Sequence, residues 1–228
     1  MIRVMPVRDP ERKLRPAGRR GGDARLGGSL LAAAAVITAG VVLPATRAVV
    51  QGVDERWYRL VQQHRSPSLG AVSRVLDIAL GTTVDWTVRI GVTALLARQR
   101  RWRALASWAT TIALGEVSIG PVKGRIDRPR PADSLVRTTQ TSYPSGHAIA
   151  AATTCPGLAL ALLPPGPGQD RWLDAAIGVA AATALSRTYL NAHWLSDALG
   201  GFCLGGGFSL LVPRIVDTVA GRAAGPAG

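Results

Sequence analysis

The stretch PSGHAIAAATTCPGLALALLPPGPGQ, residues 144–169, joins a short polar motif to a long uncharged segment. From residue 148 to residue 169 it contains no Asp, Glu, Lys or Arg, and most of its side chains are apolar. An apolar run of about 20 residues is the length that an α-helix needs to cross the hydrocarbon core of a bilayer. We therefore predict a membrane-spanning helix over 148–169, with the polar motif at its start.

Other stretches of the chain have the same character. We therefore predict an all-α integral membrane bundle of about six transmembrane helices. Besides 148–169, the predicted spans are 26–46, 78–97, 104–122, 172–189 and 198–213. Asp85 and Arg89 lie four residues apart in the second span, on one helical face, and we expect them to form a pair that faces other helices. Whether this pair contributes to a site is left open. Gly201 and Gly205 have the small-xxx-small spacing of close helix packing.

The composition excludes several classes of protein. Hydrophobic residues make up 47% of the 228 residues, charged residues make up 18%, and the mean hydropathy is +0.19, which excludes an intrinsically disordered chain. Two cysteines cannot build a disulfide scaffold. The net charge of +13 would suit a nucleic-acid-binding protein. Because the charges interrupt apolar runs instead of lining a polar face, we expect a lipid bilayer and no nucleic acid as the partner.

The charges also suggest an organisation. Residues 1–28 form a basic tail that we expect to be disordered and cytoplasmic, 29–220 form the membrane domain, and 221–228 form a short C-terminal tail. A signal peptide is the alternative for the first apolar stretch, although that stretch is long for one. Residues 54–65 read as an amphipathic segment on the membrane surface. Six spans place both termini in the cytoplasm of a multi-pass plasma-membrane protein.

Three polar clusters stand out against the apolar background. The first runs from Lys123 to Pro131, the second is Pro144–His147, and the third runs from Ser186 to Asp197. The first two flank one loop, and two spans separate the second from the third. All three clusters therefore lie on one face of the membrane, which the basic tail predicts to be the extracytoplasmic face.

The residue types in these clusters suit phosphate ester chemistry. Cationic side chains can bind a multiply charged oxyanion, and Ser145 and Gly146 lie where a helix N-terminus offers free N–H groups. His193 and Asp197 lie four residues apart, so the carboxylate can orient the imidazole as a nucleophile or base. His147 supplies a second imidazole, suited to protonating a leaving group. The cations are Lys123, Arg130 and Arg187.

These motifs resemble the signature of the type 2 phosphatidic acid phosphatase (PAP2) superfamily. The signature is Lys-x6-Arg-Pro, then Pro-Ser-Gly-His, then Ser-Arg-x5-His-x3-Asp, and this chain matches each part. The resemblance implies a PAP2/haloperoxidase-like core with His193 as the nucleophile that forms a phosphohistidine, Asp197 orienting it, and His147 as the proton donor. Phosphate binding would fall to Lys123, Arg130, Ser145, Gly146 and Arg187. No metal or other cofactor is implied.

The resemblance implies a metal-independent lipid phosphatase, with a lipid phosphate or pyrophosphate as substrate. Undecaprenyl pyrophosphate, phosphatidate and phosphatidylglycerol phosphate are all candidates, and an outward-facing site favours a polyprenyl carrier. The alternatives are a lipid phosphotransferase on the same fold, a non-catalytic lipid-binding protein, and a serine hydrolase using Ser145. A serine hydrolase would be expected to have a Gly-x-Ser-x-Gly elbow, and the sequence around Ser145 lacks one. Six spans disfavour the haloperoxidases of the superfamily. The sequence leaves the oligomeric state open.

Overall fold

The computed structural model describes residues 17–138 and 141–223, and every regular element in these ranges is an α-helix. This confirms the predicted all-α class. The helices are α1 (Ala17–Val42), α2 (Pro44–Gln63), α3 (Pro67–Ala79), α4 (Thr82–Arg98), α5 (Trp102–Arg125), α6 (Gly146–Leu162), α7 (Pro167–Tyr189) and α8 (Leu195–Ala223).

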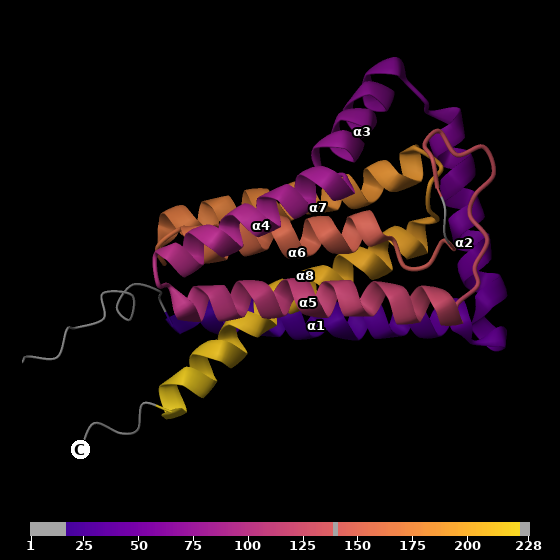
Figure 1. Cartoon of the computed structure of the whole chain (residues 1–228). Helices are drawn as coiled ribbons and strands as arrows, with labels where there is room; N and C mark the ends of the chain where they lie inside the picture. The colour runs from indigo at the N-terminus through magenta and orange to yellow at the C-terminus, as the bar shows by residue number, and fades with distance from the viewer. Residues whose placement is uncertain (1–16, 139–140, 224–228) are drawn as a thin grey trace, which may run out of the picture.

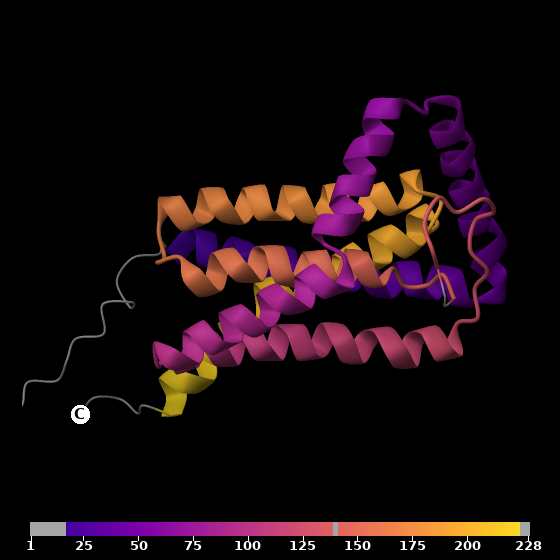
Figure 2. The same ribbon diagram turned by 45° about the horizontal axis from the view of Figure 1, so that its top comes forward.

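Most of the helices run lengthwise through the molecule, and α2 lies across one end (Figure 1). The lengthwise helices α1, α4, α5, α6, α7 and α8 correspond to the six predicted spans. Helix α2 crosses the end of the bundle, and α3 leads back from it toward α4 (Figure 2). The described chain begins and ends at the opposite end, where α1 starts and α8 finishes (Figure 1).

The N-terminal helix differs from the prediction at both of its ends. It starts at Ala17, inside the predicted tail, and Asp23 accepts a 2.7 Å hydrogen bond from Arg214 of α8. It ends at Val42 instead of residue 46, because Pro44 cannot continue a helix and instead opens α2 in its first turn. The rest of the predicted disordered tail, 1–16, lies outside the described residues.

Other helices also begin or end at residues that differ from the prediction. Helix α2 begins ten residues before the predicted surface segment 54–65. Helix α6 ends at Leu162, before the predicted end of the span at residue 169, because prolines follow it. Helix α5 continues past Pro121 to Arg125, which places Lys123 on the helix and not in the loop. Helix α8 continues past Pro213 and is much longer than the predicted 198–213.

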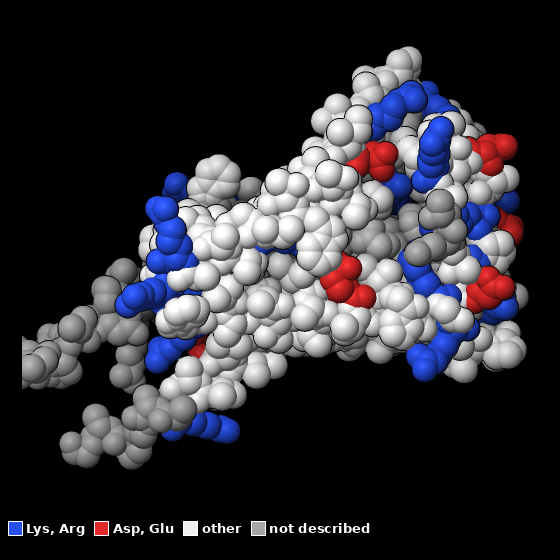
Figure 3. Space-filling view, viewed as in Figure 1, with Lys and Arg blue, Asp and Glu red and all other residues white. Residues whose placement is uncertain are grey.

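The surface is divided into bands. Lys and Arg gather at the two ends of the molecule, and a largely uncharged band lies between them (Figure 3). Large apolar side chains are exposed on the lengthwise helices, among them Val36, Ile90, Val117, Val179 and Ile215. Among the described residues, Gly22–Val42 and Leu195–Arg222 are long and apolar enough to cross a bilayer. The distribution is that of a membrane protein, and six crossings remain a prediction.

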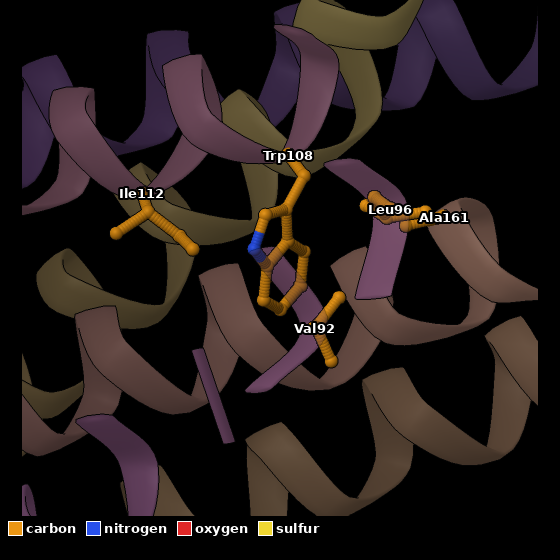
Figure 4. Packing of buried hydrophobic residues seen from close by; sticks show 5 residues of the cluster. All are labelled: Val92, Leu96, Trp108, Ile112 and Ala161. Carbon is orange, nitrogen blue, oxygen red and sulfur yellow. The ribbon is translucent and has the colours of Figure 1, made fainter. Parts of the chain in front are cut away.

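Helices α4, α5 and α6 meet around a buried tryptophan (Figure 4). The indole of Trp108 is 2% exposed and packs with Val92 and Leu96 of α4. Its N–H donates to Thr93 Oγ1 at 3.1 Å, so its one polar atom is also satisfied. This cluster fixes α5 against its neighbours toward the end of the bundle where α4 finishes and α5 begins.

The predicted pair of Asp85 and Arg89 is present, with a nitrogen–oxygen distance of 2.8 Å. The guanidinium of Arg89 also binds Glu116 of α5 at 2.5 Å and donates to Thr153 and Thr154 of α6. An Arg buried to 2% exposure needs such partners, because an isolated charge inside a membrane protein is costly. The network therefore ties α4, α5 and α6 together.

Helix α8 approaches α6 closely through two glycines. A Cβ built on Gly201 would lie 2.7 Å from the carbonyl oxygen of Ser145, and one on Gly205 would lie 2.7 Å from that of Ile149. Both distances are shorter than a carbon and a backbone oxygen tolerate. The small-xxx-small spacing thus brings the start of α8 to the start of α6, where the polar clusters lie.

We expect Gly205→Ala to destabilise the protein by more than 1 kcal/mol, because the added methyl group forces the two backbones apart. Thermal unfolding in detergent measures the effect. Gly178→Ala is the matched control, since a Cβ on this α7 glycine meets nothing within 4 Å and the change should be neutral or stabilising. Equal unfolding midpoints for the two variants would contradict the close packing.

Candidate active site

The three polar clusters meet at the end of the bundle that α2 closes. The first lies at the end of α5 and in the loop after it, the second starts α6, and the third joins α7 to α8. Backbone hydrogen bonds link them: Ser142 N–H, just before the second cluster, donates to the carbonyl of Arg128 at 2.8 Å, and Ser145 N–H donates to that of Asp197 at 3.1 Å. The structure therefore brings the predicted site residues together.

The imidazole of His193 lies in the loop between α7 and α8 and is 4% exposed. Arg130 donates to its Nε2 at 3.1 Å. A guanidinium only donates, so Nε2 carries the lone pair and the proton resides on Nδ1. Nδ1 faces Asp197 Oδ2 at 3.7 Å, which is beyond a hydrogen bond but close enough for the carboxylate to attract that proton.

Asp197 is fully buried in the first turn of α8, and its carboxylate is held from several sides. Arg128 binds Oδ1 at 2.6 Å, the hydroxyl of Ser142 donates to Oδ2, and the backbone N–H of Trp194 donates to Oδ2 at 2.9 Å. These donors stabilise the ionised form and fix the carboxylate beside His193. Sequence reasoning had not assigned a role to Arg128 or Ser142.

Arg128 extends this network to α2. Its second terminal nitrogen binds Asp54 at 2.6 Å, and Asp54 in turn accepts hydrogen bonds from the backbone and side chain of Ser196. Asp54 is 1% exposed, so its charge is balanced inside the protein. The sequence repeats the Arg-Pro dipeptide at Arg128-Pro129 and Arg130-Pro131, but this repeat does not show which carboxylates Arg128 binds.

Three cations surround the imidazoles. Lys123 and Arg130 both donate to the carbonyl oxygen of Thr141, at 3.0 and 3.2 Å. Arg187 lies in the last turn of α7 with its side chain 3% exposed, and its Nε is a buried donor without a hydrogen-bond partner in the described structure. An unmatched donor on a buried guanidinium is what an anion-binding site presents before its anion arrives.

The start of α6 adds a second anion-binding element. Ser145 is the N-cap, and its hydroxyl accepts a 3.4 Å hydrogen bond from Ala148 N–H. The N–H groups of Gly146 and His147 belong to the first turn, where a helix has no internal acceptors for them. The positive end of the helix dipole points to the same place.

The imidazole of His147 is partly exposed, and its Nε2 lies 3.6 Å from Asp77 Oδ1. The same carboxylate oxygen binds the guanidinium of Arg187. Asp77 comes from α3, the short helix beside the site. Sequence reasoning missed it because it falls just before the predicted span 78–97 and outside the three motifs.

Burial is the main electrostatic effect on two of the loop residues. It lowers the pKa of His193 to about 4, against the opposing pull of the Asp197 carboxylate. It also lowers the pKa of the Arg130 guanidinium. The imidazole of His193 is therefore neutral at physiological pH and can act as a nucleophile.

Residues that could hold a metal ion were sought in the same region. No group of three or more His, Cys, Asp or Glu side chains in the described ranges lies close enough together to do so. The expectation that no metal or other cofactor takes part remains a prediction.

Comparison with known proteins identifies the family of the chain. The PAP2 superfamily matches residues 100–220. The chain is 34% identical over 179 residues to an undecaprenyl-diphosphatase of Sulfolobus acidocaldarius, covering 73% of this chain and 80% of that protein. It is 36% identical over 90 residues to phosphatidylglycerophosphatase B of Bacillus subtilis, covering 37% of this chain and 44% of that one.

Solved structures show the same fold. The crystal structure of a transmembrane PAP2-type phosphatidylglycerolphosphate phosphatase from Bacillus subtilis superposes with a TM-score of 0.69 at 26% identity, over 85% of this chain and 96% of that one. Aquifex aeolicus LpxE superposes with a TM-score of 0.57 at 19% identity, over 70% and 93%. The latter likeness supports the fold alone.

The helical fold and the cluster of imidazoles and cations at its end define a membrane phosphatase. The chain belongs to the PAP2 superfamily. The structure places the eight predicted site residues in or beside one cluster, and their individual roles remain predictions.

The pH dependence of kcat/KM tests the state of His193. Because its pKa is lowered to about 4, the ring stays neutral and reactive down to about that pH, and activity is lost only below it. An ordinary histidine would lose it near pH 6.5. A role for His147 as the proton donor would add an alkaline limb and make the profile bell-shaped, and burial lowers the pKa of His147 as well, which moves that limb toward acidic pH. After correction for the ionisation of the substrate, an acidic limb near pH 6.5 or a flat profile would contradict this.

Proposed function

We propose that this protein is a metal-independent hydrolase of a lipid phosphate or pyrophosphate, acting through a phosphohistidine. The observation that carries the proposal is the surrounding of His193: a carboxylate on its Nδ1 side, Arg130 on Nε2, and the Arg187 charge close enough to lower the pKa of the ring. A neutral nucleophile among cations suits attack on an anionic phosphoryl group, because the cations stabilise the charge that develops on the oxygens.

The reaction has two steps. Nε2 of His193 attacks phosphorus, the bond to the leaving oxygen breaks, and His147 gives that oxygen its proton. His147 then takes a proton from water, whose oxygen attacks phosphorus and releases phosphate from His193. Arg130 must turn from Nε2 to the phosphoryl oxygens when the substrate binds, which frees the lone pair for attack. Asp197 stabilises the imidazolium-like charge on His193 through Nδ1.

A groove supports a lipid as the substrate. An apolar groove of about 670 Å³ lies among α1, α5 and α8, and its lining includes Tyr143 and Pro144, directly before Ser145. Tyr143 is held there by a 2.6 Å hydrogen bond between its hydroxyl and Thr38 of α1. A hydrocarbon chain in the groove would bring its phosphate to the start of α6, while the charged residues stay at the end of the bundle.

The position of the site supports an extracytoplasmic orientation. The site lies at the end of the bundle opposite to the beginning of α1 and the end of α8 (Figure 1). If both termini are cytoplasmic, as the basic tail predicts, the head group enters from outside. This favours a polyprenyl pyrophosphate among the candidates, and one relative is named for that substrate while the other is named for phosphatidylglycerophosphate.

The nearest alternative is a phosphotransferase, which would share every step up to the phosphohistidine and differ in the acceptor. Release of inorganic phosphate in water without any lipid acceptor distinguishes the hydrolase. A non-catalytic lipid-binding protein would have no need for both imidazoles and the carboxylate.

We expect His193→Ala to abolish phosphate release from a panel of lipid phosphates and pyrophosphates. The panel covers undecaprenyl pyrophosphate, phosphatidate and phosphatidylglycerol phosphate, assayed in detergent with and without a metal chelator. Wild-type activity should survive the chelator, and the variant should keep the wild-type unfolding profile. Full activity in His193→Ala, or loss of wild-type activity on chelation, would refute the mechanism.

The groove predicts a dependence on chain length. Ala35 lines it, whereas the neighbouring Val36 is 71% exposed and does not. We expect Ala35→Trp to raise KM at least about tenfold for a long-chain lipid phosphate, because a filled pocket loses the hydrocarbon contact. KM for a short-chain phosphate should not change. Val36→Trp is the control, and an equal effect of the two substitutions would rule out the groove as the lipid site.

A further inference from the structure

The carboxylate of Asp77 occupies a place that the proposed reaction needs for the substrate. Its Oδ1 binds the guanidinium of Arg187 and lies 3.6 Å from Nε2 of His147. In the proposed reaction, one of these groups binds a phosphoryl oxygen and the other protonates the leaving oxygen. A single carboxylate oxygen therefore contacts both groups as an oxygen of the phosphate ester would.

Helix α3 is built to present this carboxylate. Its N-cap is Ser66, whose hydroxyl accepts from Leu69 N–H, and its buried face carries Gly70 and Ser73. A Cβ on Gly70 would lie 3.9 Å from the ring of Tyr189, so this face lies against α7. Asp77 follows Ser73 by four residues and lies on the same face.

The opposite face of α3 is apolar and exposed. Its large side chains, all more than half exposed, are Leu69, Val72, Val75 and Ile78. Asp77 is the acidic residue of this helix, and its side chain is 24% exposed. It can therefore leave Arg187 by a change of rotamer, or by a small movement of α3, without exposing a packed core.

We propose that Asp77 is a positioning residue that competes with the substrate phosphate: it holds Arg187 in the free enzyme, is displaced when the phosphoryl group binds, and returns as inorganic phosphate leaves. This inference deepens the proposed function and rests on it. The physical reason is charge. A phosphate and a carboxylate cannot both lie against one guanidinium without strong repulsion, and the Asp77–Arg187 pair keeps a buried cation compensated between turnovers.

Competition of this kind has a distinct signature. Removal of the carboxylate charge should strengthen anion binding, whereas loss of a merely structural residue should weaken it. In Asp77→Asn we expect the inhibition constant of inorganic phosphate and the KM of the lipid phosphate to fall together, each by about tenfold or more. We expect kcat to fall as well, because product phosphate is no longer displaced.

The experiment compares wild type, Asp77→Asn, Asp77→Glu and Asp127→Asn in detergent. Phosphate binding is measured by calorimetry and by inhibition, and folding by thermal unfolding. Asp77→Glu keeps the charge and should bind phosphate nearly as wild type does. Asp127 is an exposed carboxylate in the loop after α5, at the same end of the molecule, and its substitution should change neither constant. Unchanged or weaker phosphate binding in a folded Asp77→Asn protein would overturn the proposal.

The displacement of Asp77 can also be tested on the wild-type protein, without any substitution. Displacement of Asp77 removes an anchor of α3, so saturating inorganic phosphate should increase amide hydrogen exchange in residues 67–79. Decreased or unchanged exchange there would contradict displacement. Calorimetry and exchange do not require turnover. If the wild type hydrolyses no lipid phosphate yet phosphate binding responds as expected, the proposed function is wrong and the competition stands. If lipid phosphate is hydrolysed but phosphate binding does not respond as expected, the proposed function stands and the competition is wrong.

Discussion

The buried carboxylate of Asp197 is the point on which the site depends. Each of the three polar clusters is bonded to this residue: Arg128 from the first, Ser142 and Ser145 beside or within the second, and Trp194 within the third. A fully buried carboxylate is costly unless such donors surround it. The bonds that satisfy it therefore also assemble the loops, and they place His193 with its Nδ1 proton toward a negative charge.

The site balances two requirements that conflict. It must attract a multiply charged phosphate, which calls for exposed positive charge, and it must remain folded when no phosphate is present. Lys123 and Arg130 meet the second requirement by donating to a backbone carbonyl, and Arg187 meets it with Asp77. The carbonyl of Thr141 is neutral, and in our proposal phosphate displaces Asp77, whereas the partners of Arg128 are the buried Asp54 and Asp197. Arg128 therefore stabilises the fold, and the other three cations are those that we propose to bind phosphate.

The membrane setting explains the rest of the architecture. Lengthwise helices expose apolar side chains, and Arg89 and Asp85 bury their charges against each other, with the partly exposed Glu116 as a further partner of Arg89. The predicted spans were right as helices over most of their length because their apolar runs are long. The span 78–97 began too early, because the chain breaks at Leu80 and Gly81 between α3 and α4. Other ends were wrong because proline acts in two ways. Pro44 ends a helix because it opens the next one, while Pro121 and Pro213 lie within helices that neighbouring helices hold in place.

The sequence by itself determined the helical class, the six apolar segments, and the histidines, aspartate and cations of the three motifs. It could do so because a bilayer imposes a length on apolar runs and because the motif residues are rare against that background. Arg128, Asp54 and Asp77 became visible only in the tertiary structure. Their roles depend on which carboxylate each guanidinium meets, and those partners come from α2, α3 and α8, between 69 and 110 residues away along the chain. No local sequence pattern indicates these ion pairs, because the partners come together only when α8 packs on α6 and α3 packs beside the end of the bundle.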